Sequence, residues 1–343
     1  MTADVLRSSI TPERLMQFTF GFAPPLIIET GIRLRVFDVL EEGARTLDEL
    51  RAATSASARG LRMVLNALVG LDLLTKDRMG RYALTAESSA FLVTGKPAFH
   101  GAFFLLTSDP MLSEWRKLCS TVQSGRPTHR INAEADGAKF FARFVEDIFP
   151  IHLPGAEQLA ASLNIPVATT PVSVLDVAAG SGVWSIAMAK ASALVRVTAV
   201  DWPDIIPITR RVTRREGVFD RYRFAADDLL AADFGEGHSV ATLGHILHSE
   251  GEDRSRQLIE KVFHSLAPGG TIAIAEILVD PDRRGPLPAL LFAVNMLVNS
   301  DHGDTFSLDE ITAWLHDAGF ADVRTIDAPG LAPEIIIASK PRE

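Results

Sequence analysis

The C-terminal half of this 343-residue sequence predicts an α/β fold with a mostly parallel sheet, and the N-terminal part predicts a helical module. Three observations support this fold class. A buried strand is joined by a glycine turn to a helix over residues 172–190, and strand and helix patterns alternate from there to the end of the chain. Before residue 98 the pattern is helical, with one short hairpin. A chain of this length is expected to form two domains, each with its own core.

Residues 1–97 are predicted to form a winged-helix-like domain. Thr46, followed by Glu49 three residues later, is typical of a helix N-terminus, and residues 57–71 give an amphipathic second helix. Two short strands within residues 73–84 complete the pattern.

A winged helix often binds DNA, but the charge distribution here disfavours that function. The predicted recognition helix carries only Arg59 and Arg62 on a largely apolar surface, so a ligand-sensing DNA-binding regulator is the weaker interpretation. Residues 18–28 are more apolar than a single amphipathic stripe requires, which suits a helix in an interface between chains.

Composition sets limits on partners and compartment. The net charge is −9, and the basic cluster within 210–215 is interpreted as a solvated helix face, so nucleic acid is not expected as a partner. The single cysteine, Cys119, excludes an intramolecular disulfide and fits a reducing compartment. No signal peptide or membrane-spanning run is predicted, so we expect a cytoplasmic protein that does not bind membranes.

Residues 98–165 are predicted to be a mostly helical connecting region, rich in aromatic side chains, with a break at 125–127. A linker at 166–171, in which two prolines flank small residues, leads into the C-terminal domain over 166–343.

The glycine turn carries Gly180 and Gly182, where the absence of Cβ atoms lets the backbone approach a ligand and adopt positive φ. With Asp176 in the preceding strand, the spacing is Asp-x-x-x-Gly-x-Gly, which differs from the Gly-x-Gly-x-x-Gly of dinucleotide sites. Two later strands end in Asp201 and Asp227. Three successive strands with acids at their ends predict a nucleoside ligand across the carboxyl edge of a parallel sheet.

These motifs resemble those of the S-adenosylmethionine-dependent methyltransferases, in particular the bacterial relatives of the plant caffeate-type O-methyltransferases. The resemblance implies a Rossmann-like catalytic domain with a mostly parallel, seven-stranded sheet, preceded by a winged-helix dimerisation domain through which the protein forms a homodimer. It also implies that S-adenosylmethionine is the cofactor, that the acceptor is a small aromatic or polyketide-like secondary metabolite, and that the connecting region lines the acceptor pocket.

The resemblance assigns the cofactor roles residue by residue. The glycine turn would lie beside the methionine part, Asp201 would bind the ribose, Asp227 would lie near the adenine amine, and Trp202 would pack on the adenine. The expected cofactor-binding residues are Asp176, Gly180, Gly182, Asp201, Trp202, Asp227 and Asp228.

His248 is the expected catalytic base. It follows the predicted strand 239–247 in His-Ile-Leu-His-Ser-Glu, which resembles the family's Ile-Leu-His-Asp-Trp. An acceptor hydroxyl is a weak nucleophile until its proton is removed, and a histidine with a pKa near neutrality can remove it. The alternative is a histidine that caps a helix or only lines the pocket.

The glutamate that orients this histidine in plant enzymes is missing from the corresponding segment, 301–307. Asp304 or Glu276, which follows the fifth predicted strand, is expected to replace it, and the sequence leaves both open.

A second mechanism uses a metal held by His248 and His302, which would stabilise an enolate for C-methylation of an α-keto acid, as the resemblance to some relatives suggests. A loop histidine such as His302 is more often solvated, so the main expectation is no metal. A third possibility is a family member that keeps the cofactor without transferring the methyl group.

Four residues are expected to contact the acceptor. His245 is predicted to lie in the fourth strand with its side chain toward the ligands, and Arg126 could bind an acceptor carboxylate beside the Gly-Pro break. Asn295 and His302 complete this set.

Overall fold

The computed structural model describes residues 11–106, 111–127, 130, 141 and 144–342. By its internal contacts the chain divides into two units, Met1–Pro110 and Met111–Glu343, and each is described by itself. The predicted three-part division at residues 97 and 165 stays a prediction.

The first unit is helical with one hairpin, as expected. Thr46 caps the fourth helix, where its side chain and Glu49 form a reciprocal capping box, and Ser57 caps the next helix. The hairpin pairs β1 with β2 in antiparallel register. The elements are α1 (Glu13–Gln17), η1 (Phe18–Phe20), α2 (Ala23–Arg33), α3 (Val36–Glu41), α4 (Leu47–Thr54), α5 (Ala58–Gly70), β1 (Leu74–Lys76), β2 (Tyr82–Leu84), α6 (Ala86–Phe91) and α7 (Gly101–Leu106).

One end of this unit presents a run of apolar side chains to solvent. Each of these side chains is more than half exposed in the single chain, which is unusual for large apolar residues so close together. They are Leu15, Met16, Phe18, Phe20 and Phe22.

The second unit alternates strands and helices. Its elements are α8 (Leu112–Trp115), α9 (Leu118–Ser124), α11 (Phe149–Ser162), η3 (Ile165–Val167), β3 (Val172–Val177), α12 (Val183–Ala191), β4 (Val195–Asp201), α13 (Ile206–Arg215), η4 (Phe219–Arg221), β5 (Tyr222–Ala226), β6 (His238–Gly244), α14 (Leu247–Ser265), β7 (Leu266–Ala275), α15 (Leu287–Asn299), α16 (Leu308–Asp317), β8 (Ala321–Asp327) and β9 (Glu334–Ser339).

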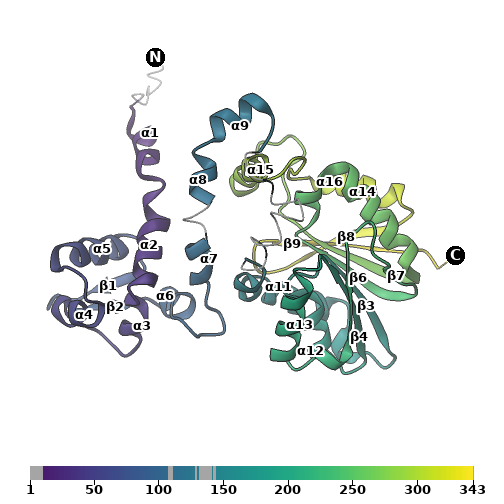
Figure 1. The fold of residues 1–343 in the computed structure, drawn as a ribbon, viewed down its shortest axis with the longest axis horizontal. Helices are drawn as coiled ribbons and strands as arrows, with labels where there is room; N and C mark the ends of the chain where they lie inside the picture. The colour runs from purple at the N-terminus through teal and green to yellow at the C-terminus, as the bar shows by residue number, and fades with distance from the viewer. Residues whose placement is uncertain (1–10, 107–110, 128–129, 131–140, 142–143, 343) are drawn as a thin grey trace, which may run out of the picture. The chain divides into compact units, whose positions relative to one another are not determined.

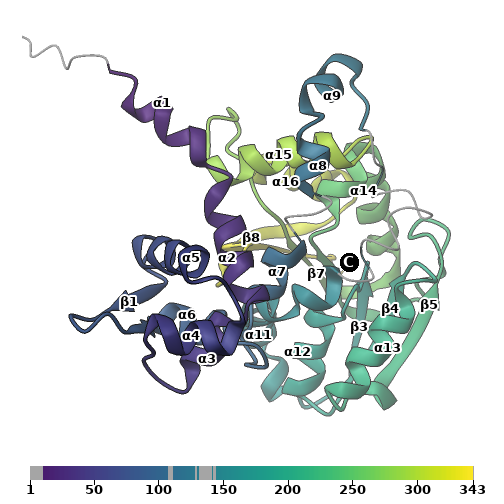
Figure 2. The ribbon, with the colours of Figure 1, turned by 60° about the vertical axis from the view of Figure 1, so that its left-hand side comes forward.

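The sheet of the second unit has seven strands in the order β5-β4-β3-β6-β7-β9-β8, which confirms the predicted fold class. The first five strands in this order pair in parallel, and β9 runs antiparallel to both β7 and β8. Figures 1 and 2 show helices on both faces of the sheet. One core packs α11, α12 and α13 on one face, and a second packs α14 and α16 on the other.

Two element boundaries differ from the sequence prediction, and both affect the site. Strand β6 ends at Gly244, and His245 has a left-handed backbone with φ of 58°, so the prediction that His245 lies in the strand is wrong. Helix α14 starts at Leu247 and is interrupted at Gly251, where φ is 76°. A histidine in the left-handed region is uncommon, and local sequence patterns give no sign of it.

None of the helices that the structure describes has the length and apolarity needed to cross a membrane.

Candidate active site

The glycine turn joins β3 to α12 at the carboxyl edge of the sheet. Gly180 and Gly182 have φ of 54° and 80°, a conformation that glycine adopts without steric cost. A Cβ atom on Gly180 would lie 3.3 Å from Val145 Cγ1, and one on Gly182 would lie 3.3 Å from Thr209 Cγ2. Both positions therefore require glycine, because of the backbone conformation and because of the space.

Asp176 lies fully buried below this turn. Its Oδ1 accepts a hydrogen bond of 2.8 Å from Thr242 Oγ1, and its Oδ2 accepts one from Ser185 Oγ. Burial raises the pKa of Asp176 to about 6, although both hydrogen bonds act in the opposite direction. The carboxyl group thus ties the first turn of α12 to β3 and β6 and holds the glycine turn in place.

Asp201 ends β4 directly beside the turn. Its Oδ2 accepts a 2.7 Å hydrogen bond from the Gly180 N–H, and its Oδ1 accepts one of 2.7 Å from the Trp202 N–H. A carboxylate offers about four acceptor positions, so two remain for the two hydroxyls of a ribose. Burial raises the pKa of Asp201 to about 7. A ligand with hydroxyl donors would satisfy this buried group, and the geometry fits the expected nucleoside cofactor.

Asp227 and Asp228 follow β5 at the same edge. The Asp227 N–H donates to the Asp201 carbonyl at 3.1 Å, and the Asp227 side chain is exposed. Asp228 forms an ion pair of 2.9 Å with Arg254, which also binds Glu250. The structure therefore brings the ends of three neighbouring strands together, and we call Gly180, Gly182, Asp201 and Asp227 the cofactor edge.

Trp202 is half-buried beside the cofactor edge. Its ring meets that of Phe141 edge-on, with centroids 6.0 Å apart. An aromatic surface next to Asp201 suits a flat base.

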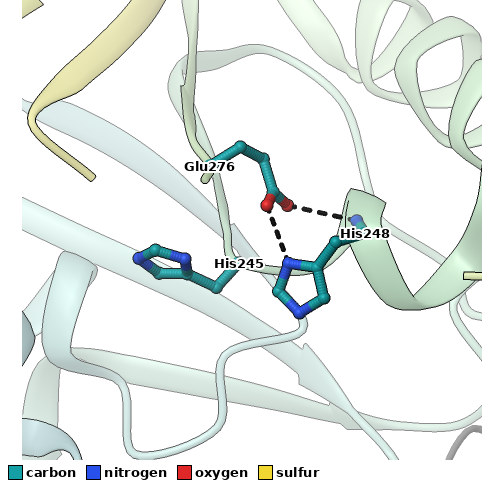
Figure 3. Close-up of side chains that lie close together, drawn as sticks. All are labelled: His245, His248 and Glu276. Atoms are coloured by element: carbon teal, nitrogen blue, oxygen red, sulfur yellow. Dashed lines mark hydrogen bonds and ion pairs between the residues drawn. The ribbon is translucent and has the colours of Figure 1, made fainter. Parts of the chain in front are cut away.

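His248 lies in the first turn of α14, and its imidazole is fixed by Glu276. His248 Nδ1 lies 2.7 Å from Glu276 Oε2 (Figure 3), and the Leu247 N–H, which the figure does not draw, donates to Glu276 Oε1 at 2.7 Å. An ionised Glu276 accepts a hydrogen bond from the Nδ1–H group of His248, so the neutral imidazole keeps its lone pair on Nε2. Burial alone would raise the pKa of Glu276, but the positive charge that His248 carries when it is protonated, together with its hydrogen bond, outweighs burial and lowers it.

Asp304, the other candidate for orienting His248, does not contact the imidazole. Its backbone N–H donates to the His248 carbonyl at 3.0 Å, whereas its side chain accepts from the Thr305 N–H at 2.7 Å and lies 3.8 Å from Arg283. Glu276 is therefore the carboxylate that contacts the His248 imidazole, whereas the side chain of Asp304 faces solvent.

His245 lies beside this pair at the end of β6. Its ring centroid is 4.3 Å from that of His152 and 6.3 Å from that of His248, and its Nε2 is buried without a hydrogen-bond partner in the described part of the chain. Burial, followed by the neighbouring His152, holds the pKa of His245 well below its ordinary value, and burial lowers that of His152 to about 4. Both rings are therefore neutral at neutral pH. We call His245, His248 and Glu276 the catalytic corner.

The catalytic corner is also the group of described residues whose side chains could hold a metal ion, since its ligand atoms lie within 4.8 Å of one another. His302 is not part of this group. Its backbone packs against Gly251, and its side chain is exposed. The hydrogen bond from Nδ1 to Glu276 orients the His248 imidazole, whether Nε2 serves as a base or as a metal ligand.

The remaining acceptor candidates lie in two places. The ring of Phe292 on α15 meets His248 edge-on at 4.8 Å, and Asn295 follows one turn later. Asn295 Oδ1 accepts hydrogen bonds from Trp115 Nε1 at 3.0 Å and from Asn299 Nδ2 at 3.1 Å. Arg126 is exposed beyond the end of α9, and no contact between described residues links it to the catalytic corner.

Several residues that build the site carry no signal in the sequence alone. Ser185, Thr242 and Thr209 hold Asp176 and the glycine turn through hydroxyl groups, and Thr209 Oγ1 donates to the Gly180 carbonyl at 2.7 Å. Hydroxyl residues are common throughout the chain, so only the folded structure distinguishes these three.

Models of known protein families match this chain in two parts. A model described as the O-methyltransferase dimerisation domain matches residues 16–94, and one described as the O-methyltransferase domain matches residues 115–321. The 3-hydroxy-5-methyl-1-naphthoate 3-O-methyltransferase of Streptomyces sahachiroi is 30% identical over 87% of this chain and 85% of its own length. The tetracenomycin polyketide synthesis 8-O-methyl transferase of Streptomyces glaucescens is 27% identical over 96% of this chain and 97% of its own.

Solved structures share the fold at lower identity. A putative O-methyltransferase from Nostoc punctiforme superposes with a TM-score of 0.87 at 24% identity, covering 97% of this chain and 100% of that one. Human N-acetylserotonin methyltransferase, solved in complex with S-adenosylmethionine, gives a TM-score of 0.83 at 23% identity, with coverages of 98% and 99%.

Proposed function

Since the chain belongs to the O-methyltransferase family and is an S-adenosylmethionine-dependent methyltransferase, we propose that it methylates a hydroxyl group of a small aromatic or polyketide-like acceptor. The observation that carries this proposal is the 2.7 Å hydrogen bond between His248 Nδ1 and Glu276 Oε2, which leaves Nε2 as a base. The named relatives that act on a naphthoate and on a tetracenomycin polyketide support the acceptor class.

The cofactor edge holds the methyl donor in this proposal. Bound S-adenosylmethionine supplies a methyl carbon that its sulfonium makes electrophilic. Asp201 accepts the ribose hydroxyls, Gly180 and Gly182 leave room for the methionine part, and Trp202 packs on the adenine. Asp176 stabilises the glycine turn through its hydrogen bonds with Ser185 and Thr242 instead of binding the ligand.

His248 removes the acceptor proton as the acceptor oxygen bonds to the methyl carbon. The bond between that carbon and sulfur breaks, and S-adenosylhomocysteine is the leaving group. The proton moves from the acceptor hydroxyl to Nε2, and the resulting imidazolium is stabilised by the Glu276 carboxylate on Nδ1. Because the pKa of Glu276 is lowered, this carboxylate is ionised at neutral pH. The proton then leaves His248 for solvent, and the base is restored.

Asn295 is proposed to orient the acceptor. Its Oδ1 accepts from two donors, Trp115 Nε1 and Asn299 Nδ2, which fixes the amide, and no acceptor among the described residues occupies its NH2 group. We infer that this group donates to a second oxygen of the acceptor, while the edge of Phe292 packs beside the reacting ring.

We further propose that the protein is a homodimer formed through its N-terminal domain. The matched dimerisation model and the exposed apolar side chains between Leu15 and Phe22 support this assembly. The single cysteine favours a cytoplasmic location, and the net charge of −9 disfavours nucleic acid as a partner.

The test is a methyl-transfer assay with the purified full-length chain. We would incubate it with S-adenosylmethionine and a panel of hydroxynaphthoates and phenolic polyketides, and follow S-adenosylhomocysteine and product mass. We expect one hydrogen of an acceptor to be replaced by a methyl group, and no product from matched acceptors whose hydroxyl is already methylated. Methylation of those blocked acceptors would contradict O-methylation.

A further inference from the structure

The basic cluster on α13 is a largely exposed helix face, as the sequence predicts, and each of its arginines also has a partner. Arg211 Nη2 lies 2.5 Å from Glu146 Oε2, and Arg215 Nη1 lies 2.6 Å from Glu146 Oε1. One carboxylate is thus shared by two guanidinium groups at positions i and i+4 of the same helix.

The other two arginines of the cluster keep α13 in place. Arg210 stacks over the ring of Phe224 at 4.4 Å, and Arg214 stacks over that of Phe219 at 4.1 Å. These contacts hold the helix on the β5 side of the sheet, where Arg211 and Arg215 present their guanidinium groups to Glu146.

Glu146 belongs to the segment that covers the glycine turn. The neighbouring Val145 is 8% exposed, and its Cγ1 lies 3.3 Å from the position of a Cβ atom on Gly180. Phe149, at the start of α11, lies below the guanidinium of Arg215 at 5.6 Å. The two ion pairs of Glu146 therefore hold the segment 144–149 against the cofactor edge.

Helix α13 also holds the glycine turn from its other side. Thr209 Oγ1 donates to the Gly180 carbonyl at 2.7 Å, and Thr209 Cγ2 fills the space beside Gly182. The turn is thus enclosed between Thr209 and Val145, and both depend on α13: Thr209 directly, and Val145 through Glu146.

We propose that Glu146, bound by Arg211 and Arg215, is a positioning residue that preorganises the cofactor site by fixing Val145 on the glycine turn. This inference rests on the cofactor edge of the proposed function but not on the identity of the acceptor. Preorganisation lowers the cost of ordering a site when the ligand binds, so loss of the two ion pairs weakens cofactor binding. The base at His248 is unaffected.

The size of the effect follows from the exposure of the ion pairs. The side chain of Glu146 is 27% exposed, and those of Arg211 and Arg215 are 59% and 48% exposed. Such pairs are weakened by solvent and salt, so we expect their loss to reduce cofactor affinity by about three- to tenfold.

Glu146→Gln is the test variant, and Glu216→Gln is its matched control. Glu216 also pairs with Arg215, at 3.2 Å, and with Lys190, at 2.9 Å, but it does not belong to the segment 144–149. Calorimetric titration with S-adenosylmethionine, without acceptor, measures affinity at low and high salt, and melting temperature measures folding. Arg211→Gln is a second variant that breaks the same contact from α13.

We expect Glu146→Gln and Arg211→Gln to weaken cofactor binding at low salt, whereas Glu216→Gln binds as the unmodified chain does. High salt should bring the unmodified chain toward the affinity of Glu146→Gln. Unchanged affinity in Glu146→Gln, or an equal loss in Glu216→Gln, would overturn the positioning role. If the unmodified chain itself fails to bind the cofactor, the proposed function fails instead.

Discussion

In the cofactor edge, backbone N–H groups of a glycine turn contribute to the site together with acids at strand ends, whereas in the catalytic corner the reactive groups are all side chains. The Asp201 side chain, at the end of β4, accepts a hydrogen bond from the N–H of Gly180, which follows the adjacent parallel strand β3. Glu276 reaches His248 from the end of a different strand, and His152 approaches His245 from α11.

This difference separates binding from chemistry. Backbone turns with fixed φ values bind a ligand that is the same throughout a family, because little can vary there without a steric clash. Side chains on α15 and α14 can change without disturbing the sheet, so reaction and acceptor are set there. Variants in the two regions should therefore affect different measurements.

His248→Ala should produce the largest effect, because it removes the base from the catalytic corner. We expect kcat to fall by about two to four orders of magnitude. The dissociation constant for S-adenosylmethionine should stay within about twofold, since the cofactor edge is intact. Steady-state kinetics and calorimetry check the two halves of this prediction, and near-normal turnover would remove His248 from the mechanism.

Glu276→Gln should have the next largest effect on turnover. Glu276 accepts from both His248 Nδ1 and the Leu247 N–H, and an amide has only one oxygen for these two donors. The imidazole loses its fixed tautomer or the backbone loses a partner, so we expect kcat to fall by about ten- to thousandfold. Asp304→Asn is the control and should leave kcat nearly unchanged, whereas equal losses would show that Glu276 has no special role.

Asp201→Asn should affect cofactor binding, because it changes the cofactor edge. The amide cannot accept from the Gly180 and Trp202 N–H groups and from two ribose hydroxyls, so cofactor affinity should fall by about ten- to hundredfold. At saturating cofactor, kcat should recover to near that of the unmodified chain. A large loss of kcat at saturation would contradict the separation of the two regions.

The titration of Asp201 should have a smaller effect, which appears in the pH dependence of the protein's stability. The folded pKa of Asp201 is raised to about 7, so its ionised form destabilises the ligand-free protein, and this contribution grows as the pH rises from about 4 to about 7. The lowered pKa of His152 acts in the opposite sense, because stability is lost as the pH falls from about 6.5 toward about 4.

Denaturant unfolding of the ligand-free chain and of Asp201→Asn, repeated across this pH range, isolates the carboxyl group. The free energy of unfolding of the variant, minus that of the unmodified chain, should increase with pH. A difference that does not change with pH would mean that Asp201 is ionised throughout, and that burial does not control it.

His302→Ala should have the smallest effect. The side chain is exposed and lies outside the catalytic corner, so kcat should change by less than about twofold. Metal analysis of the purified chain and of this variant checks the metal-assisted mechanism. A stoichiometric metal that is lost together with activity in His302→Ala would support C-methylation.

The sequence was sufficient to predict the sheet, the glycine turn and the acids of the cofactor edge, because these depend on local spacing. The strand that ends at Asp201 and the helix that begins after Thr46 occur where the sequence pattern places them. Local patterns contain no information on which of Glu276 and Asp304 reaches His248, since both lie near it and only packing selects between them.

Three features could not be predicted from the sequence for the same reason, because packing between distant segments determines them. The left-handed backbone of His245 ends β6 early, although the apolar run continues through Leu247. His152 and His245, whose rings lie together, are 93 positions apart in the sequence, by their numbers. The partners of the α13 arginines, Glu146 among them, come from segments that the sequence does not relate to that helix.

The most direct test of the central claim, O-methylation by this site, is to locate the transferred methyl group. The purified chain would be incubated with cofactor carrying a ¹³C label in its methyl group and with an accepted phenolic substrate, and the product would be examined by NMR. We predict that the label appears as a methoxy group on the acceptor and that His248→Ala abolishes its rapid formation. A label bonded to carbon, or a methoxy product formed equally fast by His248→Ala, would contradict this account.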